Sequence, residues 1–269
     1  VALARPQFGS KLKEVTRTGI EMMLAVDVSN SMLAQDFEPS RLERTKFAID
    51  RLTQQLEQDR IGLIVFAGDA YMQLPITSDY VAARSFAAQI SPTMVSKQGT
   101  AIGAAIDLAA NSFSSGSEGS RVIVVISDGE NHEDDALAAA KAAAEKGIRI
   151  YTIGIGTPEG APISIDGEFI KDEQGDMVVS KLDEQMLEQI ALTTGGAYIR
   201  ATNRSLGLDE IVQKINEVEK KELTSTVFED FNEQYQYLIG LALALLLLEF
   251  AMLERRSRLL ARFNIFRKR

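Results

Sequence analysis

The sequence predicts an α/β fold, a doubly wound and mostly parallel β-sheet flanked by helices. Short apolar runs alternate along the chain with longer segments whose apolar residues recur at helical spacing. Within the apolar runs polar residues do not alternate with apolar ones, which indicates strands that are buried on both faces. Because such strands alternate with helices, we expect a parallel sheet that is covered on both sides.

Local patterns justify each element in turn. The expected strands are residues 20–26, 61–67, 71–74, 122–126, 148–155 and 197–200. The expected helices are residues 41–57, 79–90, 101–113, 133–146, 184–194 and 206–223. The first helix follows Ser40, with Glu43 three residues later, which is the capping-box pattern of a helix start. Gly68 and Asp69 begin the short turn before the third strand, so we expect that strand to pair antiparallel at the sheet edge.

Residues 161–182 interrupt the alternation of strands and helices. The pair Asp166-Gly167 lies between two short apolar segments and is a strong signal for a two-residue hairpin turn. A second turn is expected at residues 174–176. Acidic and amide side chains at 172, 174 and 176 resemble part of a calcium loop, but the glycine falls at the wrong position. We therefore expect a β-hairpin insertion.

The C-terminal part predicts a membrane anchor. Residues 237–253 form a run of seventeen residues that is apolar on every side and is interrupted only by Glu249. That length is at the short limit for a span, and its uncharged core could also be a buried helix. Seven Arg or Lys residues in the tail favour a transmembrane helix with a basic cytoplasmic tail at 254–269. Residues 206–236 are then a helix and stalk, and residues 1–18 an N-terminal segment after a removed membrane helix.

Composition excludes several classes of function. The chain has no cysteine and one histidine, which excludes disulfides, thiolate metal sites and cysteine nucleophiles and makes histidine-rich zinc sites implausible. The whole chain carries a net charge of −9, but residues 250–269 carry +6 and Glu249 adds one negative charge, so residues 1–248 carry −14. A body this acidic is a poor binder of nucleic acid.

Polar side chains follow two of the buried strands at their carboxyl ends. Asp27, Ser29 and Ser31 come after the first strand, and Asp128 comes after the fourth. Thr100 lies at an expected helix start just after Gly99. In open α/β sheets the ligand lies at the carboxyl ends of the strands, where the strand order reverses. If the strands are neighbours, these five side chains converge, and an extended Asp-x-Ser-x-Ser segment would point its three side chains the same way.

The five side chains predict a divalent-cation site. All of their donors are hard oxygens, which suit Mg²⁺, Mn²⁺ or Ca²⁺ rather than Zn²⁺. Two carboxylates and three neutral hydroxyls compensate the charge of such an ion only in part. We therefore expect the site to bind an acidic side chain from a protein partner and not to catalyse a reaction.

These motifs resemble the metal-ion-dependent adhesion site of von Willebrand factor A domains. The matching residues are the segment "DVSNS", the threonine of "GTAIGAAI" and the aspartate of "ISDGEN". The resemblance covers roughly residues 19–222, with the A domain at 19–205. Strings such as "DRIGLIVFAGDAY", "LPITSD" and "QGTAIGAAIDLA" are similar to the membrane-anchored Bat proteins, particularly their BatB-like members.

The Bat resemblance implies a location and a set of partners. It implies a bacterial inner-membrane protein with a periplasmic A domain, working in aerotolerance or envelope stress. The expected partners are other Bat-family membrane proteins and a complex of a MoxR-type AAA+ ATPase. It also implies a binding role that is not enzymatic.

Two other functions remain open at this stage. A Mg²⁺-dependent phosphotransferase of the haloacid dehalogenase type also has an aspartate at the end of its first strand. That chemistry needs a second carboxylate two residues later as acid and base, where this chain has Ser29. A domain whose metal is purely structural is the other alternative.

Overall fold

The structure is a computed structural model. It describes residues 7–10, 19–56, 58–114, 120–131, 133–165, 167–172, 174–202, 205–227, 231–233 and 235–254. The chain forms two compact units, one of residues 16–219 and the other of residues 1–15 and 220–269.

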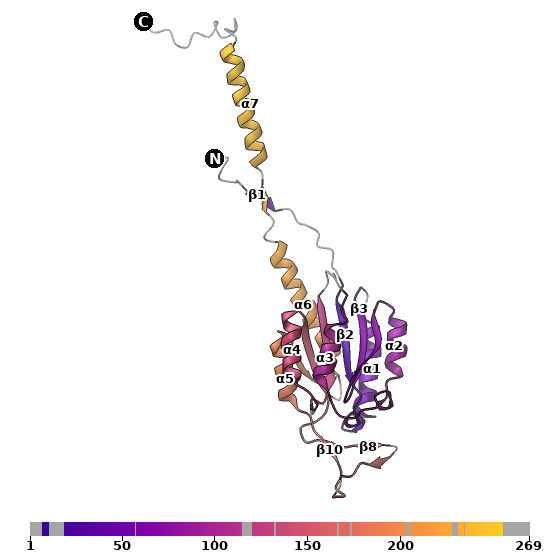
Figure 1. Cartoon of the computed structure of the whole chain (residues 1–269). Coiled ribbons are helices and arrows are strands. Elements are labelled where there is room, and N and C mark those ends of the chain that lie inside the picture. Colours follow the sequence, from indigo (N-terminus) through magenta and orange to yellow (C-terminus); the bar gives the residue numbers. More distant parts are fainter. Residues whose placement is uncertain are drawn as a thin grey trace, which may run out of the picture. The chain divides into compact units, whose positions relative to one another are not determined.

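The larger unit is built on a six-stranded sheet (Figure 1). Its strands, in spatial order, are β11 (Tyr198–Arg200), β6 (Arg149–Gly154), β5 (Arg121–Ser127), β2 (Glu21–Asp27), β3 (Arg60–Phe66) and β4 (Ala70–Thr77). Every neighbouring pair is parallel except β3 and β4, which are antiparallel at the sheet edge. The predicted mostly parallel sheet, its six strands and its antiparallel edge are therefore confirmed.

Six α-helices begin among the described residues of this unit. They are α1 (Arg41–Thr53), α2 (Tyr80–Ala88), α3 (Ile102–Ala110), α4 (Ala136–Glu145), α5 (Glu184–Thr193) and α6 (Leu208–Val227). Each was expected, although α1 ends four residues before the predicted end. The hydroxyl of Ser40 accepts a hydrogen bond from the backbone N–H of Glu43 at 3.2 Å, as a capping serine does. The carboxylate of Glu43 instead accepts from Lys46 at 2.6 Å.

Successive residues of β2 face two separate cores. Met22, Leu24 and Val26 pack with apolar residues of α1, α2 and α6. Met23 and Ala25 pack with apolar residues of α3, α4 and α5. Because period-two alternation sends both sets of side chains into a core, the strand has to be apolar throughout. The sheet is thus doubly wound, as predicted. The helices pack on its two faces, and loops follow the carboxyl ends of its parallel strands.

The insertion is an antiparallel ribbon. β7 (Ala161–Pro162) pairs with β10 (Val179–Ser180), and β8 (Ser164–Ile165) pairs with β9 (Glu168–Phe169). Gly167 and Gly175 have φ values of +85° and +92°, which glycine adopts readily in tight turns. The side chain of Asp172 accepts from the backbone N–H groups of Gln174 and Asp176, so it builds the second turn. The predicted hairpin insertion is confirmed, and Figure 1 shows it projecting from one end of the unit.

The smaller unit differs in part from the expectation. Its strands β1 (Gln7–Ser10) and β12 (Phe231–Glu233) pair antiparallel, and β12 lies inside the segment 206–236 that we predicted as helix and stalk. Helix α7 (Tyr235–Glu254) covers the predicted span. Within the described part of the chain, no helix is both long and apolar enough to cross a membrane. The span at 237–253 stays a prediction. Of the predicted tail, residues 255–269 lie outside the described residues.

Candidate metal centre

The carboxyl ends of β2 and β5 place two aspartates side by side in the fold. The two strands pair in parallel register, with Val26 opposite Ile126. Asp27 ends β2, and Asp128 directly follows β5. The chain leaves β2 toward β3 on one side, while β5 lies on the other, so the strand order reverses at this point. Both aspartates are fully buried.

The carboxylate of Asp27 is fixed by two hydrogen bonds. Its Oδ1 accepts from the backbone N–H of Ser29 at 2.9 Å, and its Oδ2 accepts from the hydroxyl of Ser127 at 2.6 Å. The Ser127 hydroxyl in turn accepts from the backbone N–H of Gly129 at 3.0 Å. Our sequence analysis missed Ser127, although its position directly before Asp128 is the signal that could have indicated it.

The two serines lie together, but the reason differs from our expectation. The Oγ atoms of Ser29 and Ser31 are 2.8 Å apart, and both residues are buried. The segment is not extended, because a 3-10 helix, η2 (Asn30–Leu33), begins directly after Ser29. The tight turn, and not strand alternation, brings the hydroxyls next to each other. Asp27, Ser29 and Ser31 are thus brought together by local structure.

Thr100 is buried in a neighbouring loop. The next residue, Ala101, donates its N–H to the carbonyl of Ala67 after β3 at 2.7 Å. The N–H of Ile102 donates to the side-chain oxygen of Asn131, in the loop that follows Asp128, at 3.3 Å. Helix α3 begins at Ile102, one residue after the predicted start at residue 101. These two bonds therefore hold the chain directly after Thr100 between the end of β3 and the Asp128 loop.

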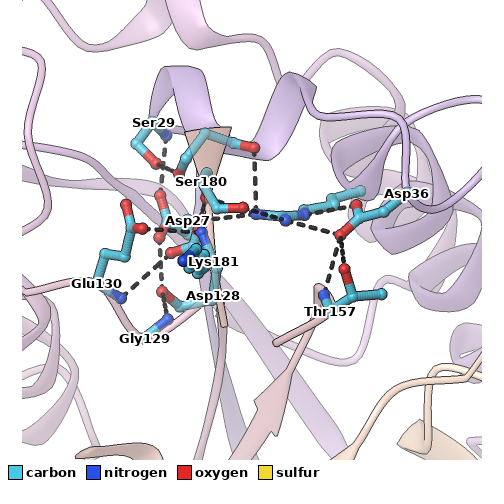
Figure 2. A network of polar contacts seen from close by, with 12 residues as sticks. Asp27, Ser29, Asp36, Asp128, Gly129, Glu130, Thr157, Ser180 and Lys181 are labelled. Carbon is cyan, nitrogen blue, oxygen red and sulfur yellow. Dashed lines mark hydrogen bonds and ion pairs between the residues drawn. The ribbon is translucent and has the colours of Figure 1, made fainter. Parts of the chain in front are cut away.

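Asp128 has partners that the sequence analysis did not foresee. Its Oδ2 accepts from Nη1 of Arg41 at 3.0 Å and from the hydroxyl of Ser180 at 3.0 Å. Its Oδ1 accepts from the backbone N–H of Glu130 at 3.3 Å. Figure 2 shows Asp27, Ser29, Asp128 and Ser180 in one group, linked to Asp36 and Thr157 on the other side of the network.

The electrostatics of the centre favour a bound cation. Burial, followed by the charge of Asp128, raises the pKa of Asp27 from 3.8 to about 7, and the hydrogen bonds from Ser127 and Ser29 offset this rise only in part. Two carboxylates in a buried site repel each other, and a divalent ion would relieve that repulsion. The carboxylate and hydroxyl oxygens also fit the donor preference of Mg²⁺, Mn²⁺ or Ca²⁺.

The centre is poor in acidic ligands. Among the described residues, no group of three or more His, Cys, Asp or Glu side chains is placed to hold a metal ion. The candidate site therefore depends on Asp27 and Asp128 together with the hydroxyls of Ser29, Ser31 and Thr100, which is the composition the sequence predicts. This assignment stays a prediction, because the geometry supports the set without testing its binding.

Comparison with known proteins identifies the family. The family model for the von Willebrand factor type A domain matches residues 21–214. Since this match covers most of the chain, the protein belongs to the von Willebrand factor type A domain family. The parallel sheet and the oxygen-rich site at its carboxyl end are consistent with that assignment.

Two solved structures are close neighbours. An aerotolerance-related membrane protein from Bacteroides fragilis is 52% identical, with a TM-score of 0.71, covering 74% of this chain and 100% of that chain. The conserved hypothetical protein BatB from Bacteroides thetaiotaomicron is 50% identical, with a TM-score of 0.72, covering 75% of this chain and 100% of that chain. The resemblance to BatB-like von Willebrand factor A proteins is thereby confirmed.

More distant relatives add less. An uncharacterized protein of Borreliella burgdorferi is 29% identical over 254 residues, which are 93% of this chain and 73% of that protein. A mussel byssus protein, proximal thread matrix protein 1, is 15% identical with a TM-score of 0.55, over 76% of this chain and 46% of that chain, and its structure has a zinc-occupied metal-ion-dependent adhesion site. That likeness shows the shared fold alone.

Proposed function

We propose that this protein is a divalent-cation-dependent protein-binding module. A cation would be held by Asp27, Ser29, Ser31, Thr100 and Asp128, and an acidic side chain of a partner protein would complete its coordination. The single observation that carries the proposal is the pair of buried carboxylates, Asp27 and Asp128, beside the buried hydroxyl pair of Ser29 and Ser31.

The charge balance supports an acidic ligand. Two carboxylates only balance the formal charge of a divalent ion, and Asp128 also accepts from the cationic Arg41 at 3.0 Å, so a bound ion would keep positive charge toward a further ligand. An acidic body would otherwise repel an acidic partner, so the ion would supply the local attraction at this end of the domain. The chain's own part is to fix the carboxylate of Asp27 through Ser127 and Ser29 before the partner arrives.

The site offers little support for catalysis. A phosphotransferase of the type considered above needs an acid or base two residues after Asp27, and Ser29 occupies that place with its hydroxyl 2.8 Å from that of Ser31. A hydroxyl is a poor proton carrier near neutral pH. A purely structural metal is the remaining alternative, and the partner experiment below separates it from the adhesion function.

The proposed partners follow the Bat resemblance. We propose that the acidic ligand belongs to another Bat-family membrane protein or to a complex of a MoxR-type AAA+ ATPase. The protein would then act in a bacterial aerotolerance or envelope-stress system. The names of the Bacteroides neighbours support this setting.

The partner experiment is a pull-down with the 269-residue chain from membranes of a Bat-encoding bacterium. We expect a Bat-type partner to be captured with Mg²⁺, lost with EDTA, and recovered when Mg²⁺ is restored. The Ser29→Ala/Ser31→Ala variant should capture none, while Ser85→Ala, an exposed serine on α2, should behave as the unaltered chain. Capture that is equal with EDTA and with the site removed would exclude the adhesion mechanism and leave a structural metal at most.

Membrane attachment is a further part of the proposal. One neighbour is named as a membrane protein, and α7 exposes a run of large apolar side chains, Ile239, Leu241, Leu243 and Leu245–Leu248. Seven Arg or Lys residues follow in the tail. By the positive-inside rule, the tail would be cytoplasmic and the A domain periplasmic at the inner membrane.

Protease protection tests this topology. In spheroplasts, added protease should degrade the A domain and leave an epitope placed after Arg269 intact until detergent is added. An epitope that is cleaved while the domain survives would reverse the orientation. Recovery of the chain in the soluble fraction without detergent would contradict the anchor.

A further inference from the structure

A fully buried arginine lies next to the candidate metal centre. Arg41 is the first residue of α1, and its side chain is completely removed from solvent. Its Nε and Nη2 donate to the two carboxylate oxygens of Asp36 at 2.8 Å each. Its Nη1 donates to Oδ2 of Asp128 at 3.0 Å. One guanidinium thus joins two carboxylates, one of which belongs to the metal centre.

The position of Arg41 indicates a specific role. The N-terminus of a helix carries partial positive charge, so a cation there is disfavoured unless anions compensate it. A buried guanidinium also requires that all of its donors be bonded. The hydrogen bonds from Arg41 and the backbone N–H of Thr157 hold the pKa of Asp36 below its usual value despite the opposing effect of burial. Asp36 therefore stays ionised and balances Arg41 together with Asp128.

Arg41 also contacts the base of the insertion. Its Nη1 donates to the hydroxyl of Ser180 at 2.8 Å, and its Nη2 donates to the Ser180 carbonyl at 3.2 Å. Ser180 lies in β10, which pairs with β7 at the start of the insertion. Its hydroxyl also donates to Oδ2 of Asp128 at 3.0 Å. Arg41, Asp128 and Ser180 therefore form a closed triangle of hydrogen bonds.

The backbone around this triangle is fitted to the guanidinium. Gly156 has a φ of +140°, and a Cβ added there would lie 3.0 Å from Cζ of Arg41. Thr157, the next residue, donates both its N–H and its hydroxyl to Oδ2 of Asp36. The loop that leads into the insertion is thus fixed to the Arg41 guanidinium through Asp36.

We infer that Arg41 is a positioning residue that fixes Asp128 for metal binding and couples the metal centre to the base of the hairpin insertion. Arg41 and Ser180 occupy Oδ2 of Asp128, which leaves Oδ1 with a single longer bond of 3.3 Å from the N–H of Glu130. The inference rests on the proposed metal site. Because coupling is reciprocal, a partner of the insertion that binds more tightly when metal is present would tighten metal binding by the same factor.

The test measures binding of Mn²⁺ alone to the 269-residue chain by calorimetric titration. We expect Arg41→Lys to weaken Mn²⁺ binding by about 10- to 100-fold, as is common when a residue that orients a metal ligand is lost. Ser180→Ala should weaken it by about tenfold at most, since the Ser180 carbonyl still accepts from Arg41. Arg51→Lys is the matched control, because Arg51 lies on the same helix with its side chain 71% exposed, and it should leave Mn²⁺ affinity unchanged.

Hydrogen exchange of the insertion's backbone amides is a second measurement. A purely electrostatic effect of Arg41 on the metal would leave it unchanged. In the unaltered chain, Mn²⁺ should slow exchange of the insertion amides that are bonded across the ribbon, such as Ile163 and Val178. In Arg41→Lys this protection should be lost even at saturating Mn²⁺. A charge-balanced variant, Arg41→Met/Asp36→Asn, serves if the lysine variant does not fold, and it should show the same two losses.

The outcomes separate the inference from the function on which it rests. If the unaltered chain binds no divalent ion, both the metal site and the role of Arg41 are wrong. If it binds Mn²⁺ and Arg41→Lys binds equally well with the insertion still protected, the metal site stands and the positioning role is refuted. Tighter binding by Arg41→Met/Asp36→Asn would likewise refute positioning.

Discussion

Replacing Asp27 with asparagine should abolish metal binding and, at the same time, make the metal-free protein more stable. Asp27 is fully buried, and its pKa is raised to about 7 by burial and by Asp128. Above pH 7 its charge is therefore a cost to the folded state, on the order of 4 kcal/mol, since the shift from 3.8 spans roughly three pKa units of about 1.4 kcal/mol each. Asparagine has the same shape without that charge, so the free energy of unfolding at pH 8 should rise.

The effect of Asp27→Asn on the metal should be large. Loss of residues that merely orient ligands already weakens metal binding by about 10- to 100-fold, so loss of a carboxylate ligand should exceed about 100-fold. The unaltered chain should gain thermal stability when Mg²⁺ is added, whereas Asp27→Asn should gain none. Thermal and denaturant unfolding with and without Mg²⁺ measure both effects on the same samples.

Asp128→Asn provides the matched contrast. It should also lose metal binding, but it should destabilise the metal-free protein by about 1–2 kcal/mol, because it removes a charged acceptor of the buried Arg41. Asp79→Asn, which changes an exposed aspartate at the start of α2, controls for the general effect of one fewer negative charge. If Asp27→Asn and Asp128→Asn change metal-free stability in the same direction, the proposed difference between their environments is wrong.

The elements of the sheet were predictable because their cause is local. Between its terminal residues Glu21 and Asp27, strand β2 is apolar at every position, and that pattern has few interpretations other than burial on both faces. Ser40 and the pair Asp166-Gly167 act within two or three residues of themselves, so their cap and turn could be identified from the sequence. Strand β12 was missed because its pairing with β1 joins segments more than two hundred residues apart.

The candidate site was predictable only in part, because some of its contacts join residues that are far apart in the sequence. Asp27, Ser29 and Ser31 are close in sequence, and Asp128 follows from the neighbouring parallel strand. Arg41 and Ser180 are 139 residues apart, and no local pattern brings them together. The one local signal was a cation at the first position of a helix, where a negative charge is favoured. Side-chain geometry was also misjudged, since η2 replaces the extended segment we expected after Asp27.

Metal affinity should depend on pH through Asp27. A metal ligand must be deprotonated, so below its pKa of about 7 the ion has to displace a proton from Asp27. Apparent Mg²⁺ affinity should therefore be about tenfold lower at pH 6 than at pH 8, and it should level off above pH 8. Titrations at fixed ionic strength across this range measure the profile. An affinity that does not change between pH 6 and pH 8 would contradict the raised pKa.

The contribution of Asp27 to stability should depend on pH in the metal-free protein and not in the metal-bound protein. Between pH 4 and pH 7 the metal-free folded state binds a proton at Asp27 that the unfolded state, with a pKa of 3.8, has lost. The unfolded state thus binds fewer protons, and the contribution of this group to stability falls as pH rises through that window. With saturating Mg²⁺ the charge is compensated, so the fall should disappear.

The hydroxyl of Ser127 sets where this transition occurs. Its hydrogen bond to Oδ2 of Asp27 lowers the pKa of that carboxyl, against the larger effects of burial and Asp128. Ser127→Ala should therefore raise the pKa and move the midpoint of the pH dependence of metal binding upward, by about one pH unit. Ser112→Ala, which removes a hydroxyl bonded to the end of α3, should leave the midpoint in place. Because Ser127 is not one of the proposed ligands, Ser127→Ala should shift the pH profile of metal binding, but metal should still bind above the new midpoint. This combination would distinguish a residue that adjusts the pKa of Asp27 from a residue that binds the ion.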